Sequence, residues 1–253
     1  MTGDRLTFVG HSTVLLELGG TRLLTDPLLR PRLLHARRVA DPPPAGVLDG
    51  LDALLVSHLH PDHLDFRSLR GLDRGVRLVV PEGGGRVVRR RGFRDITELR
   101  AGGTAAVGGV EIEAVFAAHD GRRLPVGPRV EALGFLLAAP GAPTVYFAGD
   151  TDLHDDMSEL AGRVDVALLP VGGWGPKVGE GHLDGRRAAE AAALIRPRVV
   201  IPIHWGTYLR SDLIGRRPEL LTEPPERLTE EAARLVPDVE VAVLEPGRSL
   251  ELG

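Results

Sequence analysis

Residues 57–63 of the chain read Ser57-His58-Leu59-His60-Pro61-Asp62-His63. Imidazoles and carboxylates crowded this closely lose hydration and gain nothing in return unless a cation holds them. Side chains two residues apart in an extended segment point to the same side, so His58 and His60 can converge on one ion. Asp62 and His63 then face a second ion. The stretch therefore predicts a pair of metal ions.

The segments on either side of this motif predict a strand followed by a helix. Residues 53–57 form a short apolar run, which is typical of a strand buried on both faces. In residues 62–69, Leu64, Phe66 and Leu69 lie near helical spacing. We therefore expect the histidine motif in a strand-to-helix loop, with Asp62 and His63 in the first turn of the helix.

The rest of the chain mixes strands and helices throughout its length. Apolar or alternating runs predict strands at residues 6–9, 13–18, 21–25, 77–80, 132–138, 144–147, 164–169, 198–203 and 239–244. Helical spacing predicts helices at residues 152–160, 184–195 and 225–235. Pro42-Pro43-Pro44 is the one linker-like segment, and we interpret it as a surface loop. The pattern predicts a single α/β domain over residues 1–253.

Three further donors follow apolar strands: His119, Asp150 and His204. Strand ends are where layered α/β folds build their sites, so these side chains are expected to complete the metal ligands. The chain contains no cysteine, which leaves histidine and carboxylate as donors. Such donors suit Zn, Mn, Fe or Co. We expect two divalent ions, zinc by preference, with manganese or iron as alternatives.

These donors resemble the ligand set of the metallo-β-lactamase superfamily. The matching residues are His58, His60, Asp62, His63, His119, Asp150 and His204. The resemblance implies a four-layer αβ/βα sandwich with two metals at one edge of the paired sheets. It also implies a first metal on His58, His60 and His119, a second on Asp62, His63 and His204, and Asp150 as the bridge.

Four shorter motifs resemble one branch of this superfamily, which contains the ascorbate-6-phosphate lactonases and the N-acylphosphatidylethanolamine phospholipase D enzymes. They are Val9-Gly10-His11-Ser12-Thr13, Thr25-Asp26-Pro27, Gly149-Asp150-Thr151 and Ile203-His204-Trp205-Gly206-Thr207. The resemblance extends over nearly the full length of the chain.

The expected chemistry follows from the charge of the ions. Two divalent ions roughly 3.5 to 4 Å apart lower the pKa of a shared water toward neutrality and present a bridging hydroxide. Two dications, the carboxylates of Asp62 and Asp150 and one hydroxide leave a net charge of about +1, which favours an anionic substrate. The sequence thus predicts a dinuclear hydrolase of a small anionic ester, either a phosphodiester or a lactone.

Three residues are expected beside the metal ligands. A carboxylate that accepts from the second ring nitrogen of a ligating histidine fixes its tautomer, and Asp26 and His11 are our candidates to support the ligands in this way. Both could instead serve the local turns. His11 is also a candidate catalytic residue, together with Asp62 and His182. His182 resembles a histidine near the active site of the phospholipase branch. It is the candidate to bind substrate or protonate the leaving group, or else an ordinary loop residue.

Two segments supply candidate substrate contacts. Trp174 and Lys177 lie in a glycine-rich loop after an apolar strand, where flexible backbone, one aromatic ring and one cation suit a binding loop. Trp205 and Tyr208 follow His204 and are expected to wall the pocket. A packing role is the alternative for all three aromatic residues. Arg122, Arg123 and Arg129, in the loop at residues 121–130, could clamp a phosphate or remain solvated.

Composition excludes several partners. Charged residues make up 26% of the chain and balance to a net charge of −4, without a long run of one sign, so no nucleic-acid partner is expected. The sequence starts without a basic, apolar leader and has no run near ~18 apolar residues, which favours a cytoplasmic protein without a membrane span. A nuclease and a non-catalytic metal-stabilised binding protein remain alternatives. Substrate and oligomeric state are unknown at this point.

Overall fold

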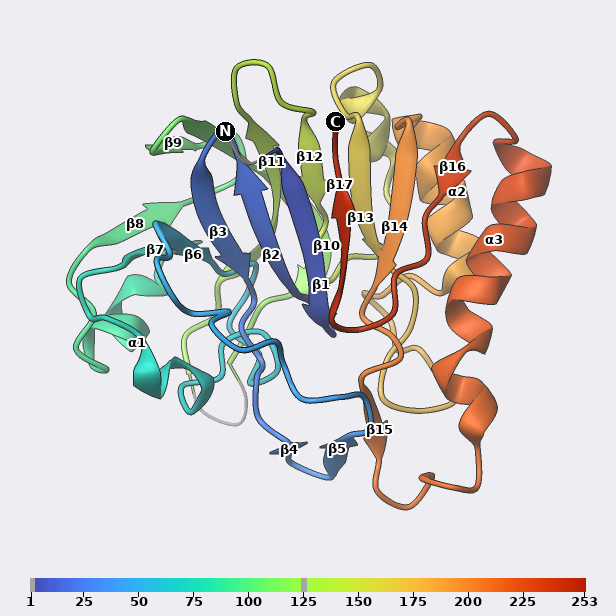
Figure 1. Ribbon diagram of the computed structural model, residues 1–253, viewed down its shortest axis with the longest axis horizontal. Helices are drawn as coiled ribbons and strands as arrows, with labels where there is room; N and C mark the ends of the chain where they lie inside the picture. Colours follow the sequence, from blue (N-terminus) through green and yellow to red (C-terminus); the bar gives the residue numbers. More distant parts are fainter. Residues whose placement is uncertain (1–2, 124–126) are drawn as a thin grey trace.

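The computed structural model describes residues 3–123 and 127–253, and two seven-stranded sheets dominate it (Figure 1). The first sheet has the order β17 (Arg248–Glu251), β1 (Arg5–Gly10), β2 (Thr13–Leu18), β3 (Thr21–Thr25), β6 (Ala53–Leu55), β7 (Arg77–Pro81) and β8 (Ile96–Leu99). The second has the order β16 (Glu240–Val241), β14 (Val199–Ile203), β13 (Val166–Pro170), β12 (Val145–Phe147), β11 (Glu131–Ala138), β10 (Val110–Asp120) and β9 (Thr104–Val107).

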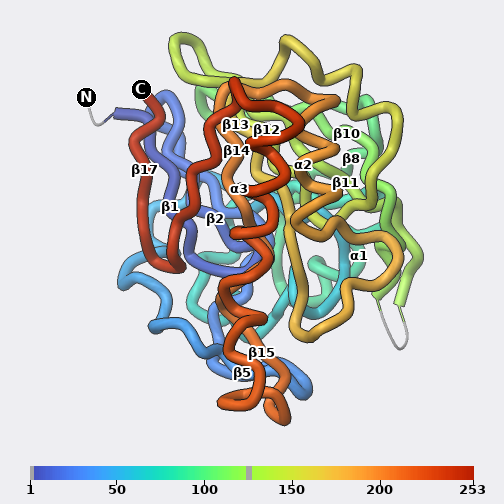
Figure 2. Tube along the Cα trace, turned by 90° about the vertical axis from the view of Figure 1, so that its right-hand side faces the viewer, coloured from blue at the N-terminus to red at the C-terminus, as the bar shows by residue number. Residues whose placement is uncertain are grey.

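The two sheets pack face to face with helices outside them. On the second sheet, α2 (Gly185–Ile195) packs against β13 and α3 (Glu223–Leu235) against β16 (Figures 1 and 2). The short α1 (Gly85–Arg89) and a 3-10 helix at Ser68–Gly71 follow strands of the first sheet. This is the predicted αβ/βα sandwich, and the fold class is confirmed.

Burial of apolar side chains holds the layers together. One core fills the space between the sheets and continues under α2 and α3, with members such as Leu16, Phe135 and Leu168. A second core, which includes Leu54, Leu78 and Phe93, covers the other face of the first sheet. The central strands β6, β13 and β14 are wholly buried, which explains their uninterrupted apolar sequences, and β7 is buried beyond its first residue, Arg77.

The predicted helix at residues 62–69 is absent, and this part of the prediction was wrong. In a helix the Leu64 carbonyl would accept the Ser68 N–H, but that N–H donates to the Asp65 carboxylate at 3.0 Å. The Arg123 guanidinium occupies the Leu64 carbonyl instead, at 3.1 Å. A local acceptor, the Asp65 carboxylate, and a distant donor, the Arg123 guanidinium, thus take up backbone groups that the helix would need. Only the turn at Ser68–Gly71 remains helical.

Other predicted elements are shorter than expected. Residues 152–160 contain only a 3-10 helix at Asp155–Leu160, and residues 239–244 contribute only β16. A third sheet was not predicted. It consists of β15 (Tyr208–Arg210), β5 (Ala36–Arg38) and β4 (Arg32–Leu33), and it lies beyond the strand ends at the bottom of Figure 1. A further 3-10 helix, Pro218–Leu221, leads into α3. In the described residues, no helix has both the length and the apolar character that crossing a membrane requires.

Candidate metal centre

The predicted metal ligands come from four separate segments of the fold. His58, His60, Asp62 and His63 occupy the loop after β6, where the backbone N–H groups of residues 63 and 64 donate to the His60 carbonyl and close a turn. The other ligands come from the second sheet. His119 lies near the end of β10, Asp150 three residues after β12, and His204 directly after β14. The structure brings all seven side chains together at one edge of the sandwich.

The first group of donors contains His58, His60 and His119, whose ligand atoms lie within 4.8 Å of one another. His119 Nδ1 donates to the Gly181 carbonyl at 2.8 Å, so its Nε2 carries the lone pair. That Nε2 lies 3.2 Å from His60 Nδ1. His58 Nδ1 lies 2.9 Å from Ser57 Oγ, which orients its Nε2 away from the serine. The three rings therefore present nitrogen atoms to one point.

The second group contains Asp62, His63 and His204, together with His11. His204 Nδ1 donates to the Gly172 carbonyl at 2.7 Å, and His63 Nδ1 lies 2.7 Å from Asp26 Oδ2. These contacts leave the Nε2 atoms of both rings free to face the shared space. His11 Nε2 lies 3.1 Å from Asp62 Oδ2, so this histidine orients the carboxylate or joins it as a donor.

Asp150 lies between the two groups. Its Oδ2 is 3.0 Å from His63 Nε2 and 4.0 Å from His58 Nε2, and its Oδ1 is 3.4 Å from His204 Nε2. The carboxylate is buried. One carboxylate in contact with histidines of both groups is the arrangement that a bridging ligand requires.

Unusual backbone conformations support this geometry. His11, Asp26 and His204 have φ values of 59°, 35° and 64°, in the left-handed region that non-glycine residues rarely adopt. Two of them are tied together, because the His204 N–H donates to the His11 carbonyl at 2.8 Å. Such strain is held by surrounding structure and gathers at functional sites.

The buried polar atoms of the site fit a bound metal. Four of them find no hydrogen-bond partner within residues 3–123 and 127–253: His58 Nε2, His63 Nε2, His204 Nε2 and Asp150 Oδ1. Unpaired buried polar atoms are rare and point to a missing ion or water. Burial also lowers the pKa of His60 to about 4 and that of His204 to about 3, so both rings are neutral at pH 7 and offer lone pairs. The donor set suits divalent cations.

His63 shows the opposite electrostatics. Burial alone would lower the pKa of His63, but the carboxylates of Asp150, Asp62 and Asp26 raise it well above the usual value. The same histidine helps to hold the pKa of Asp62 and of Asp150 below the usual value, against the effect of their burial. Three carboxylates around one ring create a strongly negative point, which a cation would neutralise.

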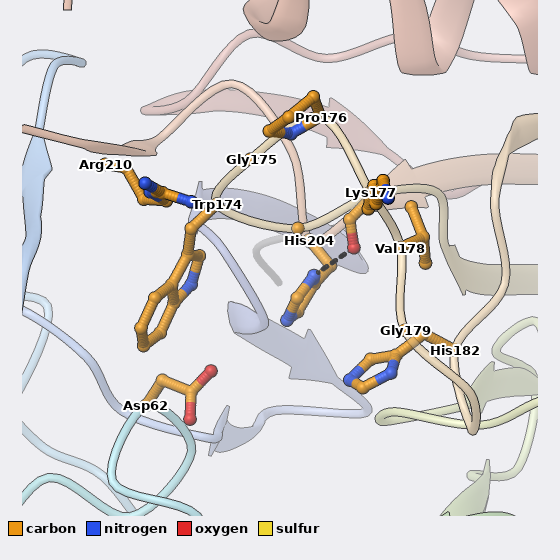
Figure 3. A pocket seen from close by; sticks show the side chains of 12 residues that line it. Asp62, Trp174, Gly175, Pro176, Lys177, Val178, Gly179, His182, His204 and Arg210 are labelled. Carbon is orange, nitrogen blue, oxygen red and sulfur yellow. Dashed lines mark hydrogen bonds between the residues drawn. The ribbon is translucent and has the colours of Figure 1, made fainter. Parts of the chain in front are cut away.

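A pocket of about 520 Å³ opens onto the second group of donors (Figure 3). The predicted contacts Trp174, Lys177 and His182 line it, together with Asp62 and His204. His182 Nε2 lies 3.4 Å from Asp150 Oδ2, so this histidine lies between the pocket and the metal donors.

The structure places Trp205 and Tyr208 away from this pocket, which corrects their expected role as its walls. Trp205 is buried, stacks on Phe8 and donates its indole N–H to the Pro202 carbonyl. Tyr208 is also buried. Its hydroxyl donates to the Arg30 carbonyl at 2.5 Å, and its ring packs edge-on to His11 at 5.8 Å. Trp205 thus belongs to the main core, and Tyr208 packs against His11.

Two arginines lie near the site: Arg210, which the sequence did not single out, and Arg123, which it offered as a candidate phosphate clamp. Arg210 lines the pocket but pairs with Asp212 at 2.8 Å. Arg123 donates to the carbonyls of Leu59 and Leu64, at 2.8 and 3.1 Å, and lies over the Phe66 ring. It therefore fastens the metal-binding loop and does not clamp a phosphate. Arg123 belongs to the predicted loop at residues 121–130. Residues 124–126 of this loop lie outside the described residues. The sequence carries no signal that distinguishes an arginine bound to backbone carbonyls from one whose side chain is solvated.

The fold and the donor set together define a metal-dependent hydrolase of the metallo-β-lactamase fold. The chain belongs to the β-lactamase superfamily domain family, whose model matches residues 21–205. It is 32% identical to a UPF0173 metal-dependent hydrolase of Anaeromyxobacter dehalogenans, over 97% of this chain and 85% of that protein. It is 33% identical to one of Methanopyrus kandleri, over 98% and 99% of the two chains.

Solved structures show the same architecture. The metallo hydrolase Igni18 of Ignicoccus hospitalis superposes with a TM-score of 0.72 at 23% identity and covers 98% of both chains. At this identity the likeness concerns the fold alone. The resemblance to the superfamily stated from the motifs is confirmed, and the particular branch stays a prediction.

Proposed function

We propose that this chain is a dinuclear metal-dependent hydrolase of a small anionic ester, built on a single domain. The observation that carries the proposal is the position of Asp150, whose carboxylate contacts histidines of two separate donor groups. His58, His60 and His119 would hold one ion, and Asp62, His63 and His204 the other, with Asp150 shared. When bound, the ions would supply Lewis acidity and a water of lowered pKa. Zinc is our preferred metal.

The residues around the donors have distinct tasks in this proposal. Asp26 accepts the Nδ1 proton of His63 and so keeps the Nε2 lone pair toward the ion. His11 donates to Asp62 and holds that carboxylate in place. These contacts favour a rigid donor set that needs little rearrangement on binding.

His182 is our candidate for proton transfer to the leaving group. It lines the pocket, and its Nδ1 donates to the Glu180 carbonyl at 3.1 Å while its Nε2 approaches Asp150 at 3.4 Å. Burial alone would lower the pKa of His182, but the contact with Asp150 raises it, so this histidine holds a proton more readily near neutral pH. A ring that holds a proton beside the pocket suits a general acid.

Positive charge at the pocket favours an anionic substrate. Lys177 lines the same pocket as His182 (Figure 3) and forms no ion pair within the described residues. Arg210 adds less charge because Asp212 pairs with it. The Trp174 ring offers an apolar face for the uncharged part of the substrate. A phosphodiester and a phosphorylated lactone both meet these requirements.

The test combines metal analysis with turnover of a generic phosphodiester and a phosphorylated lactone side by side. We expect two divalent ions per chain and turnover of one substrate, which identifies the branch. Asp62→Ala should lose most activity and bound metal while it stays folded, and Asp238→Ala, an exposed carboxylate, is the matched control. His182→Ala should lose turnover but retain metal. Normal turnover by Asp62→Ala would refute the mechanism.

A further inference from the structure

A second cavity, of about 210 Å³, lies away from the metal centre. It is formed on the outer side of the second sheet by β10, β12 and the 3-10 helix Asp155–Leu160, which packs against α2. Phe116, Tyr146 and His154 provide its aromatic lining. None of these residues takes part in the metal centre or its pocket.

The Tyr146 hydroxyl is the most informative atom of this cavity. Tyr146 is fully buried, and its hydroxyl finds no hydrogen-bond partner in the part of the chain that the structure describes. A Cβ at Gly134 would lie 2.9 Å from Tyr146 Cε2, so the glycine leaves the room that the ring occupies. Buried hydroxyls are normally paired. A hydroxyl kept unpaired against a cavity indicates a partner that enters the cavity.

His154 presents further unpaired atoms. Neither ring nitrogen has a hydrogen-bond partner among the described residues, although the side chain is only 15% exposed. Its ring packs edge-on against Phe116 at 5.1 Å. Burial lowers the pKa of His154, so the ring is neutral and offers one donor and one acceptor. The cavity thus combines aromatic faces with acceptors.

The charges around the cavity select the sign of its ligand. Glu113 and Arg163 pair at 2.5 Å and cancel. Among the described residues that line the cavity, Asp156 and Glu159 have no cationic partner. The ring nitrogen Nδ1 of His154 lies 4.0 Å from Asp156 Oδ2, but this histidine is neutral. Both carboxylates are exposed, Asp156 by 66%, so they lie at the mouth of the cavity and disfavour the approach of an anion. A cation donates hydrogen bonds only, and the Tyr146 oxygen and the carboxylates can accept them.

We propose that this cavity binds a small organic cation, a primary ammonium with a short alkyl chain. The ammonium donates to the Tyr146 hydroxyl and to the carboxylate side of the cavity, and the alkyl chain lies along Phe116. An ammonium against aromatic faces gains cation–π attraction as well. A metal ion fits less well, because only His154 and Asp156 approach each other, and every group of three or more metal donors in the described residues lies at the metal centre.

The test uses the fact that the chain has only two tyrosines, Tyr146 and Tyr208. In the metal-loaded protein labelled with ¹³Cζ-tyrosine, the spectrum contains two resonances, which Tyr146→Phe and Tyr208→Phe assign. Titration with n-propylammonium should shift the Tyr146 resonance. The Tyr208 resonance should not move, and because Tyr208 packs on His11 it reports any binding at the metal centre.

The affinity for propylammonium is measured in the same titration from the NMR signals of the amine. Tyr146→Phe removes only the unpaired hydroxyl and should fold normally, and it should weaken propylammonium binding by roughly tenfold or more, since a hydrogen bond to a charged group is lost. Tyr208→Phe should leave this affinity unchanged. The proposal is overturned if propylammonium does not shift the Tyr146 resonance, or if 1-propanol or propionate shifts this resonance equally. It is also overturned if the resonance responds to excess zinc and not to the amine.

Discussion

The most informative single perturbation of the metal centre is Asp26→Asn. Asp26 is fully buried and accepts three hydrogen bonds, from the Ser57 N–H at 2.8 Å, from Ser57 Oγ at 2.5 Å and from His63 Nδ1 at 2.7 Å. An asparagine has the same shape but only one acceptor oxygen. It therefore cannot satisfy both sides of this arrangement.

Either orientation of the amide has a specific cost. If its oxygen faces His63 and Ser57 Oγ, its NH₂ group meets the Ser57 N–H, and one buried donor is left unpaired at a cost of about 1–3 kcal/mol. If its NH₂ group faces His63, Nδ1 must accept, and the proton moves to Nε2. That proton would block the atom that faces the metal donors. A substitution behind a metal ligand typically costs 10-fold to 100-fold in metal affinity, so we expect a loss of about that size.

The assay is competition for zinc between the protein and a chromophoric chelator, combined with urea unfolding of the metal-free protein. Asp26→Asn should bind zinc more weakly and unfold at lower urea concentration. Asp238→Asn removes the same charge from an exposed position and should match the unsubstituted protein in both measurements. Zinc affinity of Asp26→Asn equal to that of the unsubstituted protein would show that Asp26 does not control the His63 tautomer.

Three further predictions follow from contacts around the site. Arg123→Ala removes the hydrogen bonds to the Leu59 and Leu64 carbonyls, so urea unfolding should show a loss of about 1–3 kcal/mol, while the exposed Arg122→Ala should show none. Gly149→Ala would place a Cβ 2.6 Å from Ser57 Cβ and should destabilise by about 1–3 kcal/mol more than Gly141→Ala, which shares a positive φ but has open space around it. Equal losses in this pair would refute the steric explanation. The raised pKa of His63 means that it is protonated near neutral pH in the metal-free protein and that metal must displace this proton. Calorimetric titration with zinc in two buffers of different ionisation enthalpy should therefore report release of at least about one proton, to which a metal-bound water would add, and identical heats would contradict this.

Much of the fold could be read from apolar patterning. Segments such as β13 and β14 are buried on both faces, and their sequences Val166–Pro170 and Val199–Ile203 are uninterrupted apolar runs. The helix predicted at residues 62–69 failed because its spacing was produced by turn residues packing into the second core, while Asp65 and Arg123 took over the backbone groups that a helix needs. The third sheet was missed because β4, β5 and β15 are only two or three residues long.

The sequence by itself determined the class of site, because a dense group of histidines and carboxylates has no stable role without a cation, and each donor follows a recognisable strand. It could not decide which neighbours serve that site. Trp205 and Tyr208 follow His204 directly but point into packed regions, while Arg123 and Asp26 reach the metal-binding loop from other segments of the chain. Only the tertiary structure decides which side chains at a strand end face the pocket at the metal centre. The physical reason is that side-chain direction there depends on backbone strain and on long-range hydrogen bonds, such as that between His204 and His11, which leave no periodic trace in the sequence.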